Sequence, residues 1–137
     1  MKTKIALADK EDRWLPRYKD EKAACVELIA KMPQVVVGGV TMPPKVLLNH
    51  RASYKVQTGI RIALPPGFKV CVAIIDELAE KGLVVSNAPA QVVGEEVVVQ
   101  VINVGRELVE IKDGDKIALA WVEPTYRFDW ELVDSIT

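Results

Sequence analysis

The sequence has few of the residue types that bind metals or carry out redox chemistry. It contains two cysteines, Cys25 and Cys71, which lie far apart without a CxxC spacing, and a single histidine, His50. Zinc sites and disulfide-exchange sites need clustered cysteines or histidines, so neither can be recognised here. We therefore expect two buried, reduced thiols, a structural or solvated His50, and neither a metal site nor a cofactor.

An excess of charge of either sign is also missing. The 18 Lys and Arg residues nearly balance the 19 Asp and Glu residues, which gives a net charge of -1. Binding to nucleic acid or to an anionic membrane needs a surplus of positive charge, so neither partner is expected. No run approaches the ~18 apolar residues of a membrane span, and residues 1–5 lack the apolar stretch of a signal peptide. The sequence therefore predicts a cytoplasmic protein.

The chain has the size of one domain. Its 137 residues are enough for one core that buries roughly two thirds of the unfolded surface, and no linker or repeat divides them. With 50% hydrophobic and 27% charged residues, the chain is too apolar to be disordered. We expect a single domain over residues 1–137.

Short runs of β-favouring residues recur between glycines and prolines. Many short strands at such spacing are typical of an all-β sandwich or barrel. The runs lie at residues 35–37, 46–48, 59–64, 69–75, 83–85, 97–104, 108–111 and 116–122. The sequence therefore predicts an all-β fold.

Two segments have helical character instead. The alanine-rich stretch at residues 20–32 is predicted to be helical from propensity alone. Residues 76–81 predict one or two helical turns, with Asp76 as the N-cap, Glu77 in the first turn and Gly82 as the stop.

The last segment has the pattern of a half-buried strand. Residues 126–132 alternate apolar and charged side chains, which places Tyr126, Phe128 and Trp130 on one face. Such a face must be buried, so the strand either closes its own sheet or docks on a neighbouring molecule.

Four stretches of the chain resemble the motifs of one enzyme family in the right order. Residues 56–68 (VQTGIRIALPPGF) are similar to VPTGxxxAxPxGY, and residues 82–89 (GLVVSNAP) are similar to GIxVxNAPG. Residues 99–105 (VQVINVG) are similar to VxLxNxG, and residues 111–118 (IKDGDKIA) are similar to IKxGDRIAQ. The chain thus resembles the trimeric dUTP diphosphatases, or dUTPases.

The two ends of the chain agree with this resemblance. Residues 5–7 and 15–18 resemble the family's opening strand and the LPxY sequence after it, and residues 23–30 (AACVELIA) fall on its first motif. The resemblance therefore replaces the helix expected at residues 20–32 with a strand. Residues 123–137 resemble the tail strand that this family exchanges between subunits.

The resemblance implies a specific architecture. The expected fold is all-β, a dUTPase-like distorted jelly-roll β-barrel with one very short helix. The barrel would span residues 1–122, and residues 123–137 would form a C-terminal strand exchanged between the subunits of a homotrimer.

The first two motifs differ in what they keep. Hydrolysis in the family requires acids that hold Mg²⁺, basic groups on the phosphates and an Asp that activates water. Glu27 occupies the position of the metal-associated Asp in the first motif, whereas Ile75, Asp76 and Glu77 replace Arg-Ser-Gly in the second. A carboxylate about 4 Å from a phosphate repels it by roughly 4 kcal/mol at an effective dielectric of 20. The second motif therefore predicts lost triphosphate affinity.

The third motif is the most altered. In the family it is a hairpin of the form GxIDxxYxG, whose Asp is the general base and whose Tyr packs on the deoxyribose. Here residues 90–94 (AQVVG) are about four residues too short for it, and Val93 stands at the position of the base. Since Val cannot take a proton, we expect neither the chemistry nor nucleoside recognition.

The fourth motif is kept and the fifth is absent. Residues 114–118 (GDKIA) retain the turn with Asp115, although Leu119 replaces the usual Gln. The fifth motif, a Gly- and Ser-rich lid over the phosphates, would begin beyond Thr137. Together the motifs predict that the scaffold is kept and catalysis is lost, which leaves Glu27, Asp76, Glu77, Val93 and Asp115 as vestigial site positions.

The preferred functional prediction is a catalytically inactive dUTPase-like homotrimer with a structural or protein-binding role. Its partners would be copies of itself and another protein surface, and a viral, specifically phage, virion component such as a capsid-decorating trimer is one form of this role. The protein would then be found in the cytoplasm or in a virion.

Two alternatives stay open at this point. The first is an active dUTP diphosphatase, or a related nucleotide hydrolase or deaminase, with a rewired site that uses Mg²⁺. The second is a regulatory trimer that binds another protein.

The trimer contacts are predicted from two sets of apolar residues. Removing the phosphate chemistry would let the clefts between subunits close, and the exchanged tail would bury its aromatic face. The predicted contacts are Ile74, Ile75, Val92, Val93, Tyr126, Phe128 and Trp130.

Overall fold

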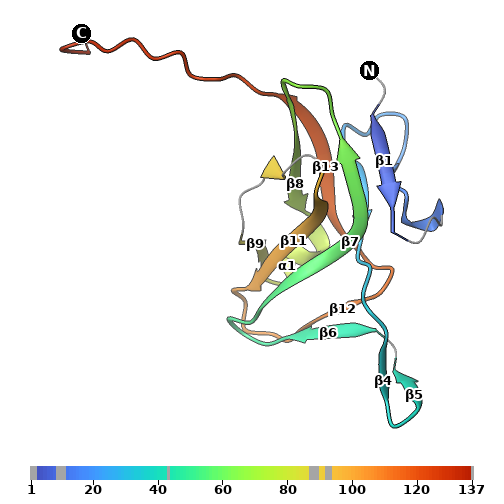
Figure 1. Ribbon diagram of the computed structural model, residues 1–137. Coiled ribbons are helices and arrows are strands. Elements are labelled where there is room, and N and C mark those ends of the chain that lie inside the picture. The colour runs from blue at the N-terminus through green and yellow to red at the C-terminus, as the bar shows by residue number, and fades with distance from the viewer. Residues whose placement is uncertain (1–2, 9–11, 43, 87–89, 92–93, 137) are drawn as a thin grey trace.

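The computed structural model describes residues 3–8, 12–42, 44–86, 90–91 and 94–136 (Figure 1). In these residues, antiparallel strands form two larger sheets and one small sheet around a common core, and a second small sheet lies outside that core. One short α-helix and one 3-10 turn, η1 (Asp12–Trp14), complete the described part. The expectation of an all-β fold with one very short helix is confirmed.

The four-stranded sheet has the order β1-β7-β11-β9. Its strands are β1 (Lys4–Leu7), β7 (Ser53–Ala63), β11 (Glu96–Asn103) and β9 (Leu83–Val85). Burial alternates along β11, where Val97, Val99, Val101 and Asn103 point into the core. The alternation follows from the strand backbone and not from the residue types, because Val98 and Ile102 on the half-buried face are apolar too.

The five-stranded sheet has the order β10-β8-β13-β3-β2. Its strands are β10 (Ala90–Gln91), β8 (Phe68–Ile74), β13 (Lys116–Pro124), β3 (Val26–Ile29) and β2 (Arg17–Tyr18). The helix expected from propensity at residues 20–32 is wrong, because residues 26–29 form strand β3. Leu28 is buried there and pairs with Ala118 of β13, so packing outweighs the helical preference of the alanines.

Helix α1 (Asp76–Glu80) lies where the sequence predicts a helix. Ile75, with extended backbone, is the N-cap and no side chain caps the helix, so the expectation that Asp76 is the cap is wrong by one position. Leu78 anchors the helix in the core. Gly82 follows with φ of +103°, and a Cβ there would lie 2.6 Å from the Cα of Gly105, so only glycine fits this stop.

The buried side-chain amide of Asn103 links the end of β11 to two neighbouring segments of the chain. The Asn103 Nδ2 donates to the carbonyl oxygens of Leu48 and Glu107, both at 2.8 Å, and its Oδ1 accepts from the amide of Gly105 at 2.9 Å. A fully buried amide is tolerated because its donors and its acceptor are satisfied. The small sheet of β6 (Lys45–Leu48) and β12 (Val109–Lys112) is attached there.

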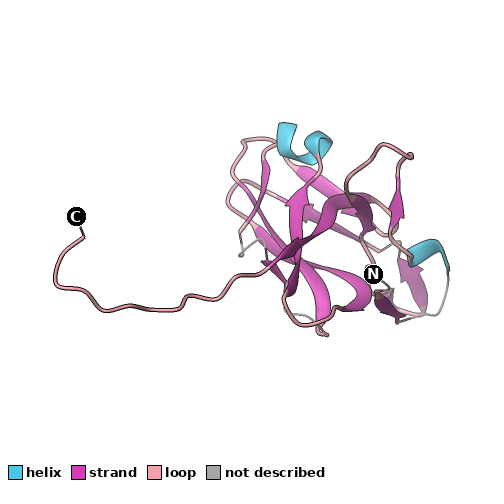
Figure 2. Cartoon of the chain, turned by 90° about the horizontal axis from the view of Figure 1, so that it is seen from above, coloured by secondary structure: helices cyan, strands magenta, loops and turns pink. Residues whose placement is uncertain are grey.

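Two parts of the chain project from the barrel (Figures 1 and 2). The hairpin of β4 (Val35–Val37) and β5 (Val40–Met42) lies at one end, and residues 125–136 leave the other end after β13. These tail residues have no regular secondary structure and are all exposed. Among the described residues, no helix is long and apolar enough to cross a membrane.

Candidate functional site

The sheet brings the first, second and fourth motifs to one place. Across its three central strands, Leu119 of β13 lies in register with Glu27 of β3 on one side and with Ala73 of β8 on the other. Residues in register on neighbouring strands project from the same face, so Leu119, in place of the usual Gln, borders the Glu27 position. Ile75, at the start of the second motif, donates its amide to the carbonyl oxygen of Ile117 at 3.1 Å.

Glu27 is paired with a cation of the fourth motif. Its Oε1 lies 3.2 Å from the Nζ of Lys116, with side-chain exposures of 21% for Glu27 and 60% for Lys116. A pair this exposed contributes only about 0–1 kcal/mol to stability. Its consequence is chemical instead, since a metal at Glu27 would compete with Lys116 for the carboxylate.

The second-motif acids lie at the start of α1 and face solvent. Asp76 and Glu77 occupy the first helical turn and both are exposed. Among the described residues, neither has an ion pair with a basic group. The helix dipole favours these two negative charges, so the start of α1 presents a negative surface.

Asp115 and Asp113 of the fourth motif hold the chain in a turn. The Oδ2 of Asp115 accepts the amide of Lys112 at 2.8 Å, and the Oδ1 of Asp113 accepts the amide of Met32 at 2.7 Å. Backbone hydrogen bonds from Gly114 to Ala30 and from Ala30 to Asp115 add to this clamp. The structural contribution of Asp113 was not predicted, because its partner lies 81 residues away in the sequence.

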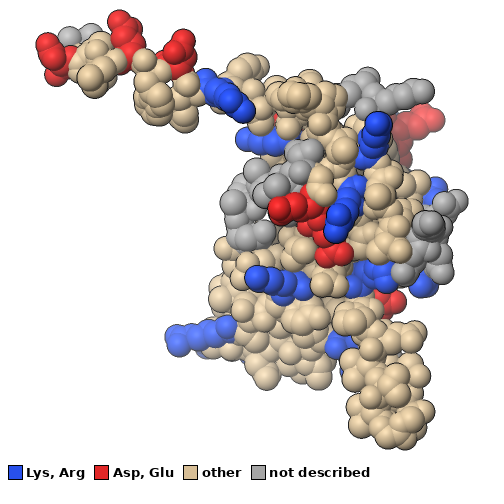
Figure 3. Space-filling model, viewed as in Figure 1, with Lys and Arg blue, Asp and Glu red and all other residues tan. Residues whose placement is uncertain are grey.

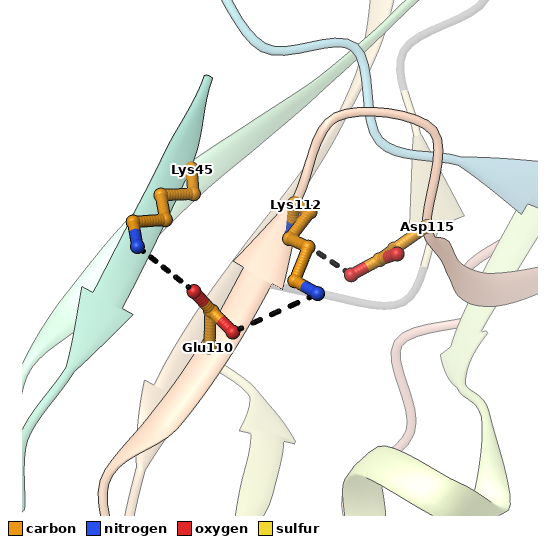
Figure 4. A network of polar contacts seen from close by, with 4 residues as sticks. All are labelled: Lys45, Glu110, Lys112 and Asp115. Carbon is orange, nitrogen blue, oxygen red and sulfur yellow. Dashed lines mark hydrogen bonds and ion pairs between the residues drawn. The ribbon is translucent and has the colours of Figure 1, made fainter. Parts of the chain in front are cut away.

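An ion-pair network borders this turn (Figure 4). Glu110 lies between two lysines, with its Oε1 3.3 Å from the Nζ of Lys45 and its Oε2 4.0 Å from the Nζ of Lys112. Lys45 and Lys112 are thus each paired with Glu110. Because these ion pairs are exposed to solvent, they contribute little to the stability of the fold.

The third motif falls largely outside the described residues, and Val92 and Val93 are among those left out. Next to them, Ala90 pairs with Cys71 of β8, and the amide of Gly94 donates to the carbonyl oxygen of Ile62 at 3.0 Å. Ile74 and Ile75, the other apolar positions expected at a trimer contact, are half-buried against the core.

The described residues hold no group of three or more His, Cys, Asp or Glu side chains close enough to bind a metal ion together. Glu27, Asp76, Glu77 and Asp115 are therefore not assembled into a ready ligand set within one copy of the chain.

An apolar groove of about 780 Å³ was not predicted from the sequence. It runs between β1 and β2, which are both edge strands of their sheets, and β13 forms part of its floor. Its lining is mainly apolar and includes Ile5, Tyr18, Val26, Ile62, Trp121 and Val122.

A polar cluster lies at one rim of this groove. The Nε1 of Trp121 donates to the Oε1 of Glu123 at 2.8 Å, and this hydrogen bond lowers the pKa of the Glu123 carboxyl. Burial, followed by the charge of Glu123, raises the pKa of the Cys71 thiol. Cys71 is therefore a protonated, buried thiol, as expected for a structural cysteine, whereas the expectation of burial is wrong for Cys25, which is only half-buried.

The tail carries apolar surface that nothing in its own chain covers. Tyr126, Phe128 and Trp130 are 90%, 80% and 81% exposed, and the rings of Phe128 and Trp130 stack with centroids 4.6 Å apart. The tail is not a strand within the single copy, and its aromatic stripe is accessible to another molecule.

No family model matches the chain. Curated relatives do match it, and each is a deoxyuridine 5'-triphosphate nucleotidohydrolase. The one from Anaplasma marginale is 30% identical over 127 residues, covering 90% of this chain and 80% of the relative. The one from Wolbachia of Drosophila simulans is 33% identical over 129 residues, covering 91% and 78%.

Solved dUTPase structures have the same fold. The dUTPase of phage phi11 of S. aureus superposes with a TM-score of 0.76 at 12% identity, covering 99% of this chain and 98% of that one. The Staphylococcus bacteriophage 80alpha dUTPase with dUPNHPP gives 0.77 at 12%, covering 98% and 89%. That phage protein is described as controlling the transfer of virulence genes by a G protein-like mechanism.

The fold and the ordered motifs thus define a β-barrel of the dUTPase type. On the identity and coverage of its curated relatives, the chain belongs to the deoxyuridine 5'-triphosphate nucleotidohydrolase family. The resemblance found in the sequence is confirmed, as is the jelly-roll fold that it implied.

Proposed function

We propose that this member of the family does not hydrolyse nucleotides and acts as a homotrimer with a structural or protein-binding role. The observation that carries the proposal is the reversed charge of the second motif. Asp76 and Glu77 face solvent at the start of α1, where the family motif supplies a phosphate-binding Arg. An incoming triphosphate would meet two carboxylates instead of a guanidinium.

The remaining motif positions support the same proposal. Val93 at the position of the base has no proton-accepting atom, and Leu119 replaces a polar side chain beside Glu27. Asp115 accepts a hydrogen bond from the backbone amide of Lys112, and Glu27 forms an ion pair with Lys116. Among the acids at motif positions, Glu27 and Asp115 thus have structural partners, and Asp76 and Glu77 lie at the start of α1. In the described residues, none of the four lies beside a second group that could act as the general base of hydrolysis.

Assembly through the tail is the second part of the proposal. Among the described strands, β1 and β2 are sheet edges that flank the apolar groove, so an added strand could pair with one of these edges and place its side chains in the groove. The aromatic stripe of Tyr126, Phe128 and Trp130 from a neighbouring copy suits it. Three aromatic side chains of about 150 Å² or more, at about 25 cal/mol per Å², give on the order of 10 kcal/mol before ordering costs.

A face-specific experiment tests this assembly. We expect that changing Tyr126, Phe128 and Trp130 together to Ser converts a trimer into monomers or aggregates, as measured by light scattering. Changing Arg127, Asp129 and Glu131 to Ser alters the other face of the same segment and should leave the trimer intact. A stable trimer of the first variant would show that the tail does not hold the assembly together.

The biological role is proposed at two levels. A threefold β-barrel suits a threefold position in a lattice, so a phage virion component such as a capsid-decorating trimer is the preferred form. The alternative, a regulatory trimer that binds another protein, is favoured by the structural likeness to the phage 80alpha dUTPase, which is described as controlling gene transfer. The protein would act in the cytoplasm or, in the first case, in a virion.

The enzyme alternative is favoured by the relatives themselves, because each one quoted is a nucleotidohydrolase by name. In that case Glu27, Asp76, Glu77 and Asp115 would supply the Mg²⁺ ligands. Calorimetry with a nonhydrolysable dUTP analogue in Mg²⁺ distinguishes the non-hydrolysing trimer from the enzyme. We expect no binding heat up to millimolar ligand, and micromolar affinity for the analogue would sink the non-hydrolysing reading.

A further inference from the structure

The two sheet edges beside the apolar groove differ in what they offer to an added strand. Strand β1 offers the four residues Lys4–Leu7, whereas β2 offers only Arg17–Tyr18. Among the described strands, β1 pairs with β7 alone, so its other edge is open to a further ladder. Each additional residue in register adds to the ladder of hydrogen bonds, so a segment as long as residues 126–132 gains more from β1 than from β2.

Strand β1 has one apolar face and one face that carries a cation. Ile5 lines the groove and Leu7 packs against the core, so these two side chains share the inner face. Lys4 and Ala6 therefore lie on the outer face. Lys4 is exposed and forms no ion pair within the described part of the chain. Its ammonium group is thus available to an acid of a neighbouring strand.

The tail has the complementary charge. When its aromatic face enters the groove, Asp129 and Glu131 lie on the outer face, the same face as Lys4. Residues 125–137 contain one basic and three acidic residues, and Figure 3 shows the acidic side chains on the outer part of the tail. Residues 1–19, which contain both groove edges, carry six basic and three acidic residues. Opposite charges therefore favour tail acids beside the groove edges.

The tail does not reach the groove of its own chain in a comparable pairing. The amide of Thr125 donates to the carbonyl oxygen of Gly67 at 2.7 Å, which fixes the point where the tail leaves the barrel. From there the tail leads away from β1 (Figures 1 and 2). The aromatic stripe begins at the next residue, Tyr126, and a reversal would use two to five residues for a loop. The occupant is therefore the tail of another copy.

We propose that the tail of a neighbouring copy pairs antiparallel with β1, with Phe128 opposite Ile5 and Asp129 opposite Lys4. This inference rests on the proposed assembly through the tail, and it adds the edge, the direction and the register. The four residues of β1 are then all paired, and the three tail aromatics face the groove.

Charge selects this direction over the opposite one. In the antiparallel pairing Arg127 falls opposite Ala6, whereas a parallel pairing with the same centre places Arg127 opposite Lys4, where like charges repel. Lys4 is thus a specificity determinant for the tail, and the aromatic face supplies the strength of the contact. Because an exposed ion pair contributes little energy, neutral Ser on the outer face still leaves the trimer intact.

Disulfide formation between copies tests the register. Residues directly opposite each other on antiparallel strands have Cα atoms about 4.5–5.5 Å apart, within the range of a disulfide. In a Cys25→Ser background, Lys4→Cys with Asp129→Cys should form covalent trimers on mild oxidation, as seen on a non-reducing gel. Arg17→Cys with Asp129→Cys tests the β2 edge and should stay uncrosslinked. The buried Cys71 should not react.

Light scattering of the Cys25→Ser chain distinguishes a failed register from a failed assembly. A trimer in which the Lys4→Cys and Asp129→Cys pair does not crosslink, or in which the Arg17→Cys pair crosslinks instead, would overturn the proposal and leave the trimer standing. Monomers in the Cys25→Ser chain would overturn the proposed trimer, and this inference with it.

A charge exchange provides a second readout in the full chain. Lys4→Glu and Asp129→Lys each place like charges opposite one another, which should weaken association roughly fivefold at each contact. The two changes together reverse the pair and should restore the association of the unchanged chain. A dilution series followed by light scattering measures this. A double variant as weak as either single variant would contradict the pairing of Lys4 with Asp129.

Discussion

The turn of the fourth motif and the first turn of α1 each carry two acids. Within the described residues, only the acids of the fourth motif accept hydrogen bonds from the backbone. Asp113 and Asp115 accept backbone amides from Met32 and Lys112. Asp76 and Glu77 make no ion pair among the described residues and face solvent. The acids of the fourth motif are thus explained by folding, whereas those of the second motif have no structural partner that would require them.

This difference separates what the scaffold needs from what a ligand needs. A motif that folds the chain can persist after its ligand is lost, because each buried amide still requires its acceptor. A motif that only contacts a phosphate has no such requirement and can change sign. The two regions therefore respond differently to substitution, and four predictions use that difference.

The largest effect is expected from restoring the second motif. Ile75→Arg, Asp76→Ser and Glu77→Gly together change the local charge by three units, at about 1 kcal/mol each for charges 4 Å away in a solvated site. Affinity for inorganic tripolyphosphate should rise roughly 100-fold, as measured by calorimetry. Glu21→Arg with Glu131→Ser changes the net charge by the same three units away from α1, and an equal gain in affinity there would mean that the second motif plays no part.

Asp113→Ala should be the most destabilising change in the turn. It leaves the partly buried amide of Met32 without its acceptor, which costs about 1–3 kcal/mol. Chemical denaturation should show the loss as a lower midpoint with an unchanged slope. A variant as stable as the unchanged chain would show that water replaces the carboxylate.

Asp115→Ala should cost less, about 0.5–1.5 kcal/mol, because its hydrogen bond to the amide of Lys112 is exposed and water can satisfy that amide. Asp115→Asn retains an acceptor oxygen and serves as the control in the same denaturation experiment. If Asn is no better than Ala, the charge of Asp115 matters more than its hydrogen bond.

The smallest effect is expected for Asp76→Ala and Glu77→Ala. Each removes only a favourable interaction with the positive end of a short helix, worth about 0.3–1 kcal/mol at low salt and less at physiological salt. Thermal unfolding at two salt concentrations measures this. A loss above that of Asp113→Ala would reveal a structural partner for these acids and would remove the contrast between the two turns.

The local patterns predicted the elements better than the contacts between them. The β-favouring run at residues 97–104 predicted strand β11, and Gly82 predicted the end of α1. Residues 20–32 misled the propensity argument, since strand β3 forms there through its pairing with β13. The clamp between Asp113 and Met32 joins positions that are distant in sequence, so no local pattern could indicate it.

The sequence motifs predicted which residues belong to the candidate site, but not the contacts that these residues make. The ordered motifs indicated which acids to compare, but the Lys116–Glu27 pair and the groove between β1 and β2 depend on how strands from both ends of the chain meet. The alternation at residues 126–132 predicts a strand with one buried face, whereas in the single copy these residues are exposed and form no strand. Whether it forms a strand depends on a second molecule, which a single sequence does not contain.

The rate of dUTP hydrolysis in Mg²⁺ tests the central claim most directly. The unchanged chain and its Glu27→Gln variant should both release pyrophosphate at the rate of the protein-free control, because the proposed function leaves the second and third motifs without a phosphate-binding cation and a general base. Turnover by the unchanged chain that Glu27→Gln abolishes would contradict the account and would identify the protein as a working dUTP diphosphatase.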